Sequence, residues 1–211
     1  MVAPSNRDAV ALLDGWRDWS SNRLALVGPP GSGKTHLVHV WAAETGALVR
    51  PAAGLRAEDA PGLAEAPLAV EDVDRALAGG TLDDAALFHL WNAFARAGLP
   101  LLLTGRTSPA DWPARLPDLA SRLESLTPVR IGPPDDALLT VLLVKLFEDR
   151  QVRVRPALVG WLLNRMERTH EAAMRTVARL DRAALAQGRA VDVVLAREVL
   201  GDRLDSHDGE A

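Results

Sequence analysis

The segment that most constrains the fold of this 211-residue chain is Gly-Pro-Pro-Gly-Ser-Gly-Lys-Thr at residues 28–35. A short apolar run, Leu24-Ala25-Leu26-Val27, precedes it, and a helical pattern follows from Lys34 to about Glu44. The glycines permit backbone conformations and close approaches that side chains would forbid. The spacing G-x-x-x-x-G-K-T between a strand and a helix is that of a P-loop, which we therefore expect here.

A P-loop binds phosphate through its backbone. Backbone N–H groups and the N-terminus of the following helix point at the anion, the lysine adds a point charge, and the threonine hydroxyl can ligate Mg²⁺. We therefore expect ADP or ATP with Mg²⁺, bound by Gly28, Pro29, Pro30, Gly31, Ser32, Gly33, Lys34 and Thr35. Of the 24 basic residues only Lys34 and Lys145 are lysines, so a lysine at this position stands out.

A carboxylate at the end of a neighbouring strand usually completes the magnesium site of a P-loop protein. Here the apolar run Leu68-Ala69-Val70 is followed by Glu71 and Asp72. We predict that Thr35, Glu71 and Asp72 hold the metal, with Asp72 in the water-activating position. The usual order is an aspartate and then the residue that activates water; because this order is reversed, we expect weak or no intrinsic ATP hydrolysis. The alternative is an acidic loop that merely follows a strand.

The hydrophobic pattern predicts an α/β domain with a five-stranded parallel sheet over residues 1–133, and a small helical lid over residues 134–211 with a flexible tail from about residue 201. The predicted strands are 24–27, 47–50, 67–70, 100–104 and 128–131. The first domain also has predicted helices at 34–44, 82–97 and 116–123, a short N-terminal helix before the first strand, and a loop with a short helix at 51–66. Thr81 is the predicted N-cap of the helix at 82–97. After Gly132-Pro133-Pro134 the predicted helices are 135–149, 156–166, 169–187 and 191–200.

Composition excludes several classes of protein. There is no cysteine, which removes disulfides and thiolate metal sites, and the five histidines form no pair with ligand-like neighbours. The net charge of −4 is spread evenly, unlike that of a dedicated DNA-binding domain. Residues 150–189 hold nine arginines, which form either solvated helix faces or a surface for phosphates or an acidic partner. No signal peptide or membrane span is expected, and we predict a cytoplasmic protein that reaches the nucleoid through partners.

Three further segments resemble proteins of bacterial replication control. Residues 33–40, Gly-Lys-Thr-His-Leu-Val-His-Val, resemble a segment of the AAA+ initiator DnaA. Residues 116–123, Leu-Pro-Asp-Leu-Ala-Ser-Arg-Leu, are similar to the corresponding segment of the Hda family, DnaA-related inactivators of the initiator, and Leu180-Asp181-Arg182-Ala183 continues the similarity. The resemblance runs from Ser5-Asn6 to about Leu200. It implies an AAA+ module with a helical lid.

The resemblance also implies a partner and a role. The family's arginine finger falls on Arg122. Such a residue enters a neighbour's nucleotide site and stabilises charge on the γ-phosphate. The chain would then act in trans on DnaA, promote hydrolysis of DnaA-bound ATP and so restrain replication initiation. The alternative is a surface arginine that pairs with Asp118 or Glu124.

Some positions depart from the family pattern. Thr104-Gly105-Arg106 stands where a polar or acidic sensor is usual, and the lid's sensor arginine aligns with Glu171, with Arg168 and Arg175 nearby. We treat Arg106, Arg168 and Arg175 as candidate phosphate contacts. The glutamine-anchored motif that binds the sliding clamp is absent, since the first glutamine is Gln151, so clamp binding stays in doubt. The initiator's helix-turn-helix domain is also missing, and we expect no sequence-specific DNA binding.

Two other functions remain open on the sequence. One is a self-sufficient P-loop ATPase or kinase. The other is an adaptor for replication proteins, which would bind nucleotide only for its own stability. Self-association is left open as well. Trp16 and Trp19 pack in the core or line an adenine pocket, and His36 and His39 on the P-loop helix are expected to pack or hydrogen-bond rather than catalyse.

Overall fold

The computed structural model describes residues 2–201. The chain divides into two compact units, an α/β unit over Asn6–Gly132 and a helical unit that begins at Pro133 and also takes in the residues before Asn6. The predicted tail lies outside the described residues except for Gly201. Each unit is described by itself below.

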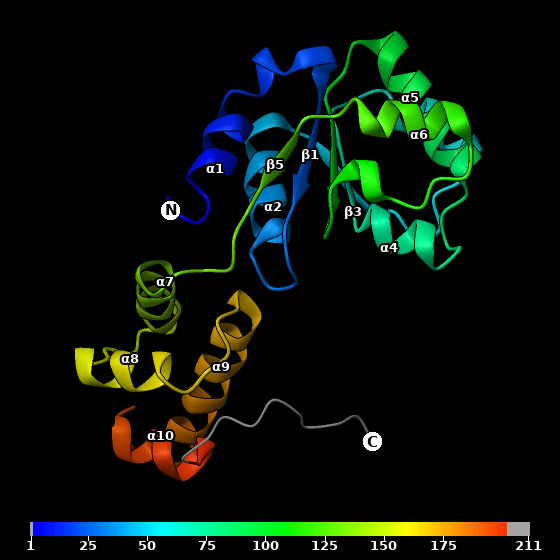
Figure 1. The fold of residues 1–211 in the computed structure, drawn as a ribbon. Coiled ribbons are helices and arrows are strands. Elements are labelled where there is room, and N and C mark those ends of the chain that lie inside the picture. The colour runs from blue at the N-terminus through cyan, green and yellow to red at the C-terminus, as the bar shows by residue number, and fades with distance from the viewer. Residues whose placement is uncertain (1, 202–211) are drawn as a thin grey trace. The chain divides into compact units, whose positions relative to one another are not determined.

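The α/β unit is built on one five-stranded parallel sheet, as predicted (Figure 1). Its order is β2-β3-β4-β1-β5. The inner strands are short uninterrupted apolar runs because both of their faces are buried. The strands are β1 (Arg23–Val27), β2 (Leu48–Pro51), β3 (Leu68–Glu71), β4 (Leu101–Gly105) and β5 (Pro128–Arg130).

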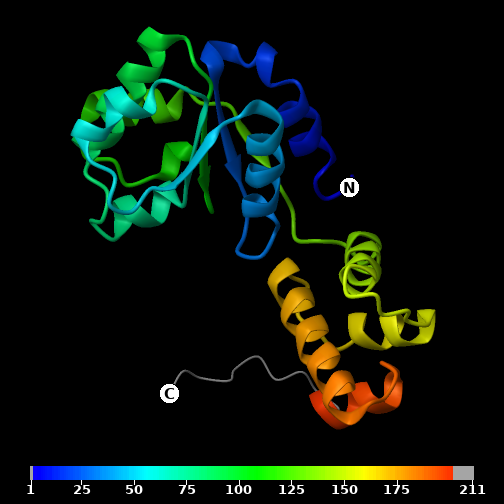
Figure 2. The same cartoon turned by 180° about the vertical axis from the view of Figure 1, so that it is seen from behind.

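Helices cover both faces of this sheet (Figures 1 and 2). On one face α1 and α2 pack through Leu13, Val38 and Trp41 against β1, β3, β4 and β5. On the other face α3 to α6 bury a larger cluster that includes Leu87 and Phe94. The helices of this unit are α1 (Arg7–Asp14), α2 (Lys34–Thr45), α3 (Ala60–Leu63), α4 (Val73–Ala78), α5 (Asp84–Ala97) and α6 (Pro117–Glu124). The 3-10 turns are η1 (Trp16–Asp18), η2 (Ser20–Asn22), η3 (Ala57–Asp59) and η4 (Pro109–Asp111).

The prediction for the start of α5 was wrong in one respect. Thr81 is not the N-cap, since its hydroxyl donates to the Ala76 carbonyl at the end of α4. Asp83 caps the helix instead and accepts from the Ala85 N–H at 3.4 Å. The sequence reading also missed α4, which begins directly after the acidic pair. The N-cap prediction failed because the turn that closes α4 already uses the threonine hydroxyl.

The helical unit consists of four helices around its own apolar core. They are α7 (Asp136–Glu148), α8 (Pro156–Leu163), α9 (His170–Gln187) and α10 (Val193–Leu200). Asp135, Thr169 and Asp192 each accept a backbone N–H as N-caps, which explains where three of the helices begin. Leu139, Phe147, Leu158 and Leu180 are among the fully buried residues. Within residues 2–201, no helix is both long and apolar enough to cross a membrane.

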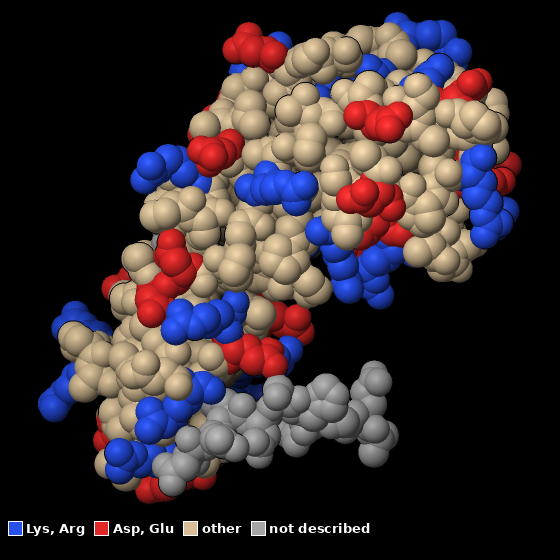
Figure 3. Space-filling view, viewed as in Figure 1, with Lys and Arg blue, Asp and Glu red and all other residues tan. Residues whose placement is uncertain are grey.

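Charged side chains of both signs are interspersed over the visible surface (Figure 3). No broad field of one sign covers the face shown. In the helical unit several arginines of the 150–189 stretch are paired, as in Arg150–Asp181 and Arg189–Glu198. This favours the solvated-face interpretation for the paired arginines.

Candidate nucleotide-binding site

The topology of the sheet collects the predicted site residues at one edge. In parallel strands all carboxyl ends lie on the same side, and ligands of such sheets bind there. Val27, at the end of β1, is in register with Gly105 at the end of β4, and the Gly28 N–H donates to the Gly105 carbonyl at 3.2 Å. The P-loop after β1, the acidic pair of β3 and Arg106 after β4 are therefore neighbours.

Glycines shape the loop at two places that matter. Gly31 and Gly33 adopt φ values of 71° and 100°, a region that L-residues with side chains rarely occupy. A Cβ on Gly28 would stand 2.4 Å from the Ile131 carbonyl oxygen and 2.6 Å from the Ile131 Cγ2 atom. The loop is thus pressed against the end of β5, and its backbone curves into a cradle before α2.

Lys34 is folded onto its own loop. Its Nζ donates to the carbonyl oxygens of Gly28 at 2.7 Å and Pro29 at 3.0 Å, and the residue is buried. Burial lowers the pKa of Lys34, the Asp72 carboxylate opposes this shift, and the Arg106 charge adds to it. The ammonium is therefore held at the loop, close to groups of both signs.

The loop fits a polyphosphate by its own chemistry. Ser32 is only 3% exposed, and its hydroxyl oxygen has no hydrogen-bond partner. Leaving a buried polar group unpaired costs about 1–3 kcal/mol. Phosphate oxygens in the cradle would accept from this hydroxyl, from the loop N–H groups and from Lys34. Gly28 to Thr35 are therefore the residues that would hold the phosphates.

The metal-binding prediction rests on oxygen donors at the same edge. Thr35 is exposed, and within residues 2–201 neither its hydroxyl nor the half-buried Glu71 carboxylate makes a hydrogen bond or an ion pair. Asp72 instead faces Arg75, with 3.7 Å between carboxylate oxygen and guanidinium nitrogen. In the described part of the chain no three acidic or histidine residues form a metal site by themselves. The oxygen donors of Thr35, Glu71 and Asp72 would fit Mg²⁺ where phosphate oxygens and water complete its shell, and Asp72 would have to share its carboxylate with Arg75.

Two residues of this edge have structural roles that the sequence did not predict. The Thr104 hydroxyl accepts from the Asp72 N–H at 3.0 Å, which fixes the left-handed turn after β3. The buried Asp74 accepts from the Arg106 N–H at 2.8 Å through Oδ2, while its Oδ1 has no partner. The third acidic residue in Glu-Asp-Val-Asp was the available signal for Asp74. Thr104 was noted only as part of the segment that stands where a polar or acidic sensor is usual, and its bond to Asp72 was not predicted.

Arg122 lies away from this edge. It is in the last turn of α6, donates to the Asn92 side-chain oxygen at 2.6 Å, and stacks on the Phe88 ring at 4.5 Å. It forms no ion pair with Asp118 or Glu124, so that alternative was wrong for this structure. The charge of Arg122, after burial itself, lowers the pKa of Arg23, which begins β1. Arg122 is thus close to the amino ends of the strands.

The other two candidate arginines belong to the helical unit. Arg168 pairs with Asp136, and both side chains are more than half exposed. Arg175 pairs with Glu171 at 2.7 Å and faces Glu167 at 3.8 Å. Glu171, the residue aligned with the lid sensor, therefore neutralises a neighbouring arginine.

The aromatic and histidine candidates have ordinary surroundings. Trp19 is buried, stacks on Trp41 with 5.4 Å between ring centroids, and donates to the Leu12 carbonyl. It belongs to the core, whereas Trp16 is half-buried at the margin of the same cluster. His36 and His39 are exposed on α2.

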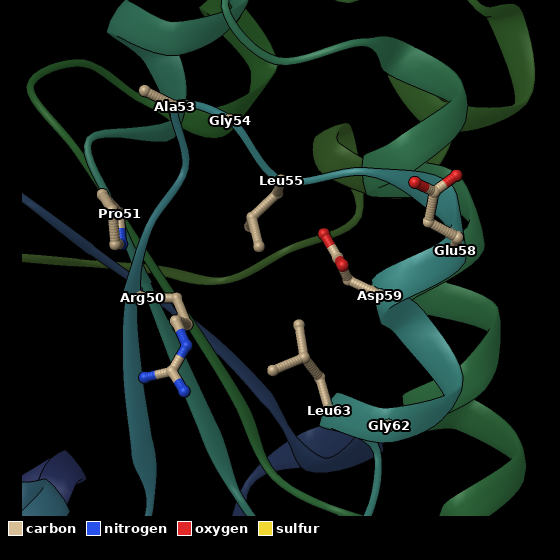
Figure 4. A pocket seen from close by; sticks show the side chains of 9 residues that line it. All are labelled: Arg50, Pro51, Ala53, Gly54, Leu55, Glu58, Asp59, Gly62 and Leu63. Atoms are coloured by element: carbon tan, nitrogen blue, oxygen red, sulfur yellow. The ribbon is translucent and has the colours of Figure 1, made fainter.

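One pocket of the α/β unit lies apart from the P-loop. It measures about 610 Å³ and lies between the edge strand β2 and the η3–α3 segment (Figure 4). Leu55, Asp59 and Leu63 point into the space beside the strand. Strands β3 and β4 separate β2 from β1, so this pocket is distinct from the phosphate cradle.

No known protein-family profile matches the sequence. The fold is nevertheless shared with several solved structures. Domain III of the replication initiation protein DnaA from Thermotoga maritima superposes with a TM-score of 0.78 at 17% identity, over 97% of this chain and 94% of that chain. AMPPCP-bound DnaA from Aquifex aeolicus gives 0.67 at 17% identity, over 89% and 65%. The RuvB Holliday junction branch migration motor from Thermotoga maritima gives 0.71 at 18%, over 94% and 69%.

These similarities show the fold class. The chain shares the fold of DnaA domain III and of RuvB, and its five-stranded parallel sheet followed by a helical unit agrees with the sequence prediction. At such low identities the likeness establishes architecture and no more. Function must be argued from the residues of the site.

Proposed function

We propose that this protein is an AAA+ regulator of replication initiation: it binds ADP or ATP and stimulates ATP hydrolysis by DnaA through Arg122. In this role the bound nucleotide organises the chain. The reaction itself takes place at the γ-phosphate of the partner's ATP.

The observation that carries this proposal is the position of Arg122 at the opposite edge of the sheet from the P-loop. The charge of Arg122 affects the pKa of Arg23, which is the first residue of β1. The P-loop begins directly after Val27, which is the last residue of the same strand. A parallel strand rises about 3.3 Å per residue, so five residues separate the two edges by about 16 Å. An arginine side chain cannot span that distance. Arg122 therefore cannot serve the P-loop of its own α/β unit and is suited to act on another molecule.

The setting of Arg122 suits a residue that acts on a partner. Stacking on Phe88 and the bond to Asn92 restrict the guanidinium, which retains further N–H donors for an anion. Preorganised donors of this kind stabilise charge that develops in a transition state. An arginine finger contributes about 10³–10⁵ in rate in well-characterised cases.

The order of the two acidic residues, Glu71 and Asp72, favours the expectation that this chain hydrolyses ATP only weakly by itself. Asp72, in the water-activating position, is one methylene shorter than a glutamate and faces Arg75. A general base must lie within hydrogen-bonding reach of the water that it activates. Glu71 precedes it in the place of the usual aspartate, so metal binding and water activation are not matched.

Nucleotide binding by structural neighbours adds support from outside the chain. The DnaA of Aquifex aeolicus was solved with AMPPCP bound, and its fold is the one described here. The P-loop sequence and the unpaired Ser32 hydroxyl supply the corresponding chemistry in this chain.

The test measures hydrolysis of ATP bound to DnaA after addition of this protein loaded with ADP. Arg122→Ala is expected to abolish the stimulation while leaving ADP affinity unchanged. Arg7→Ala, which removes an exposed arginine elsewhere in the α/β unit, serves as the control and is expected to stimulate normally. Unchanged stimulation by Arg122→Ala would refute the role of this residue. Rapid ATP hydrolysis by the protein alone would instead favour the self-sufficient ATPase.

A further inference from the structure

We propose that Arg106 is a second cation for the nucleotide polyphosphate and partly replaces Mg²⁺, so that nucleotide binding by this chain depends only weakly on the metal. The inference rests on the proposed nucleotide site and specifies its chemistry. It concerns the residue that stands where the resemblance led us to expect a polar or acidic side chain.

The backbone at Arg106 is fixed on three sides. The carbonyl of the preceding Gly105 accepts from the Gly28 N–H at 3.2 Å, which joins the end of β4 to the first residue of the P-loop. The Arg106 N–H donates to Asp74 at 2.8 Å. The Gly105 backbone also lies against Trp112, since a Cβ there would meet the Trp112 ring at 2.6 Å. The side chain therefore leaves from a defined point beside the loop.

The guanidinium of Arg106 is exposed and unpaired. Across residues 2–201 it makes no hydrogen bond, ion pair or ring contact, and only its backbone N–H is engaged. Arg75, the other arginine near the acidic pair, is engaged with Asp72. All five N–H donors of Arg106 thus remain for an anion.

Arg106 is also within electrostatic range of Lys34. Its positive charge lowers the pKa of the Lys34 ammonium, which already bonds to the loop carbonyls. An anion placed between the two cations would be attracted to both of them. Glu71, Asp72 and Asp74 face the same lysine and oppose this effect.

The consequence for the metal follows from charge. Mg²⁺ ordinarily neutralises the phosphate oxygens that a single P-loop lysine leaves exposed. A guanidinium supplies charge and paired N–H donors suited to phosphate. A guanidinium that binds the same phosphates would also repel Mg²⁺. Both effects reduce the contribution of Mg²⁺ to nucleotide affinity.

The test is calorimetric titration of ADP into the full chain, with Mg²⁺ and with EDTA. For the wild type we expect removal of Mg²⁺ to weaken binding by less than about threefold. Arg106→Ala should bind about 10–100-fold more weakly than the wild type in EDTA, the value of hydrogen bonds to charged groups, and recover much of this loss with Mg²⁺. Arg106→Glu should depend on Mg²⁺ still more strongly.

Controls separate this effect from a general one. Arg96→Ala removes another exposed arginine, in the last turn of α5, and should behave as the wild type. The melting temperature of Arg106→Ala without nucleotide should be unchanged because the side chain has no partner. Equal Mg²⁺ dependence of the wild type and Arg106→Ala overturns the inference. If ADP does not bind, or binds equally to Lys34→Ala, the proposed nucleotide site itself fails. Binding that needs Lys34 but ignores Arg106 overturns only the role of Arg106.

Discussion

At the scale of single residues, the P-loop lysine is prearranged for its ligand. The Lys34 ammonium is buried against two carbonyl oxygens of its own loop, so it already lies at the proposed site. A bound polyphosphate would exchange these neutral acceptors for charged ones, which form stronger hydrogen bonds. The buried hydroxyl of Ser32 gains a partner in the same step.

The close approach of Gly28 to β5 predicts the effect of adding one methyl group. In Gly28→Ala the Cβ would stand 2.4 Å from the Ile131 carbonyl oxygen. Because this oxygen belongs to the backbone, the P-loop or the chain at Ile131 would have to move. Overpacking of this kind costs about 1–3 kcal/mol. We expect a lower melting temperature and weaker ADP binding.

Gly62→Ala is the matched control for this substitution. A Cβ at Gly62 meets nothing within 4 Å, and its φ is not positive. The change should be neutral or stabilise the protein by up to about 1 kcal/mol. A Gly28→Ala variant as stable and as tightly binding as this control would show that the loop is not pressed against β5.

At the scale of elements, Asp84 joins helix α5, which holds Phe88 and Asn92, to helix α6, which holds Arg122. Its Oδ2 atom, in the first turn of α5, accepts from the Arg115 N–H and from the Leu116 N–H just before α6, the latter at 2.6 Å. These bonds set where α6 begins. They also hold Arg122 over Phe88 and Asn92.

Asp84→Ala should therefore lower the free energy of unfolding by about 1–3 kcal/mol, since two backbone donors lose a charged acceptor. Urea denaturation measures the change. Asp111→Ala, an exposed aspartate in η4 whose carboxylate has no partner, should stay within about 0.5 kcal/mol of the wild type. An equal loss in both variants would mean that Asp84 has no special structural role.

The elements also show what the sequence could and could not predict. The three inner strands were predictable because strands buried on both faces are apolar runs between turn signals, whereas the partly exposed edge strands β2 and β5 give a weaker pattern. The P-loop was predictable because its chemistry lies within eight consecutive residues. The α4 helix was missed because six residues are too few to show a helical period.

The contacts of the site residues could not be predicted from the sequence for another reason. Asn92 and Phe88 contact Arg122 from about thirty positions away, and Thr104 contacts Asp72 at a similar separation. Such contacts come from the packing of elements. No pattern within one segment encodes them.

At the scale of the whole molecule, the chain has separate apolar cores. The clusters on the two faces of the sheet use only residues of the α/β unit, and the third cluster uses only residues between Leu139 and Leu200. We therefore predict two cooperative units. Leu103→Ala and Leu158→Ala each open a cavity at a residue 1% exposed and should cost about 2–5 kcal/mol.

Hydrogen exchange with mass spectrometry checks this prediction. Leu103→Ala should accelerate exchange in β1, β3 and β4, and Leu158→Ala should accelerate it in α7 to α10. The wild type in the same buffer is the reference. Uniform acceleration along the chain in both variants would show a single cooperative unit instead.

The account as a whole depends on a polyphosphate in the cradle at residues 28–35. The most direct test is the identification, by mass spectrometry, of the nucleotide that co-purifies with the protein. We predict ADP or ATP with the wild type and with Lys145→Ala, which alters the only other lysine, and none with Lys34→Ala. The same nucleotide content in Lys34→Ala, or a wild-type protein that neither carries nor binds an adenine nucleotide, would contradict the account.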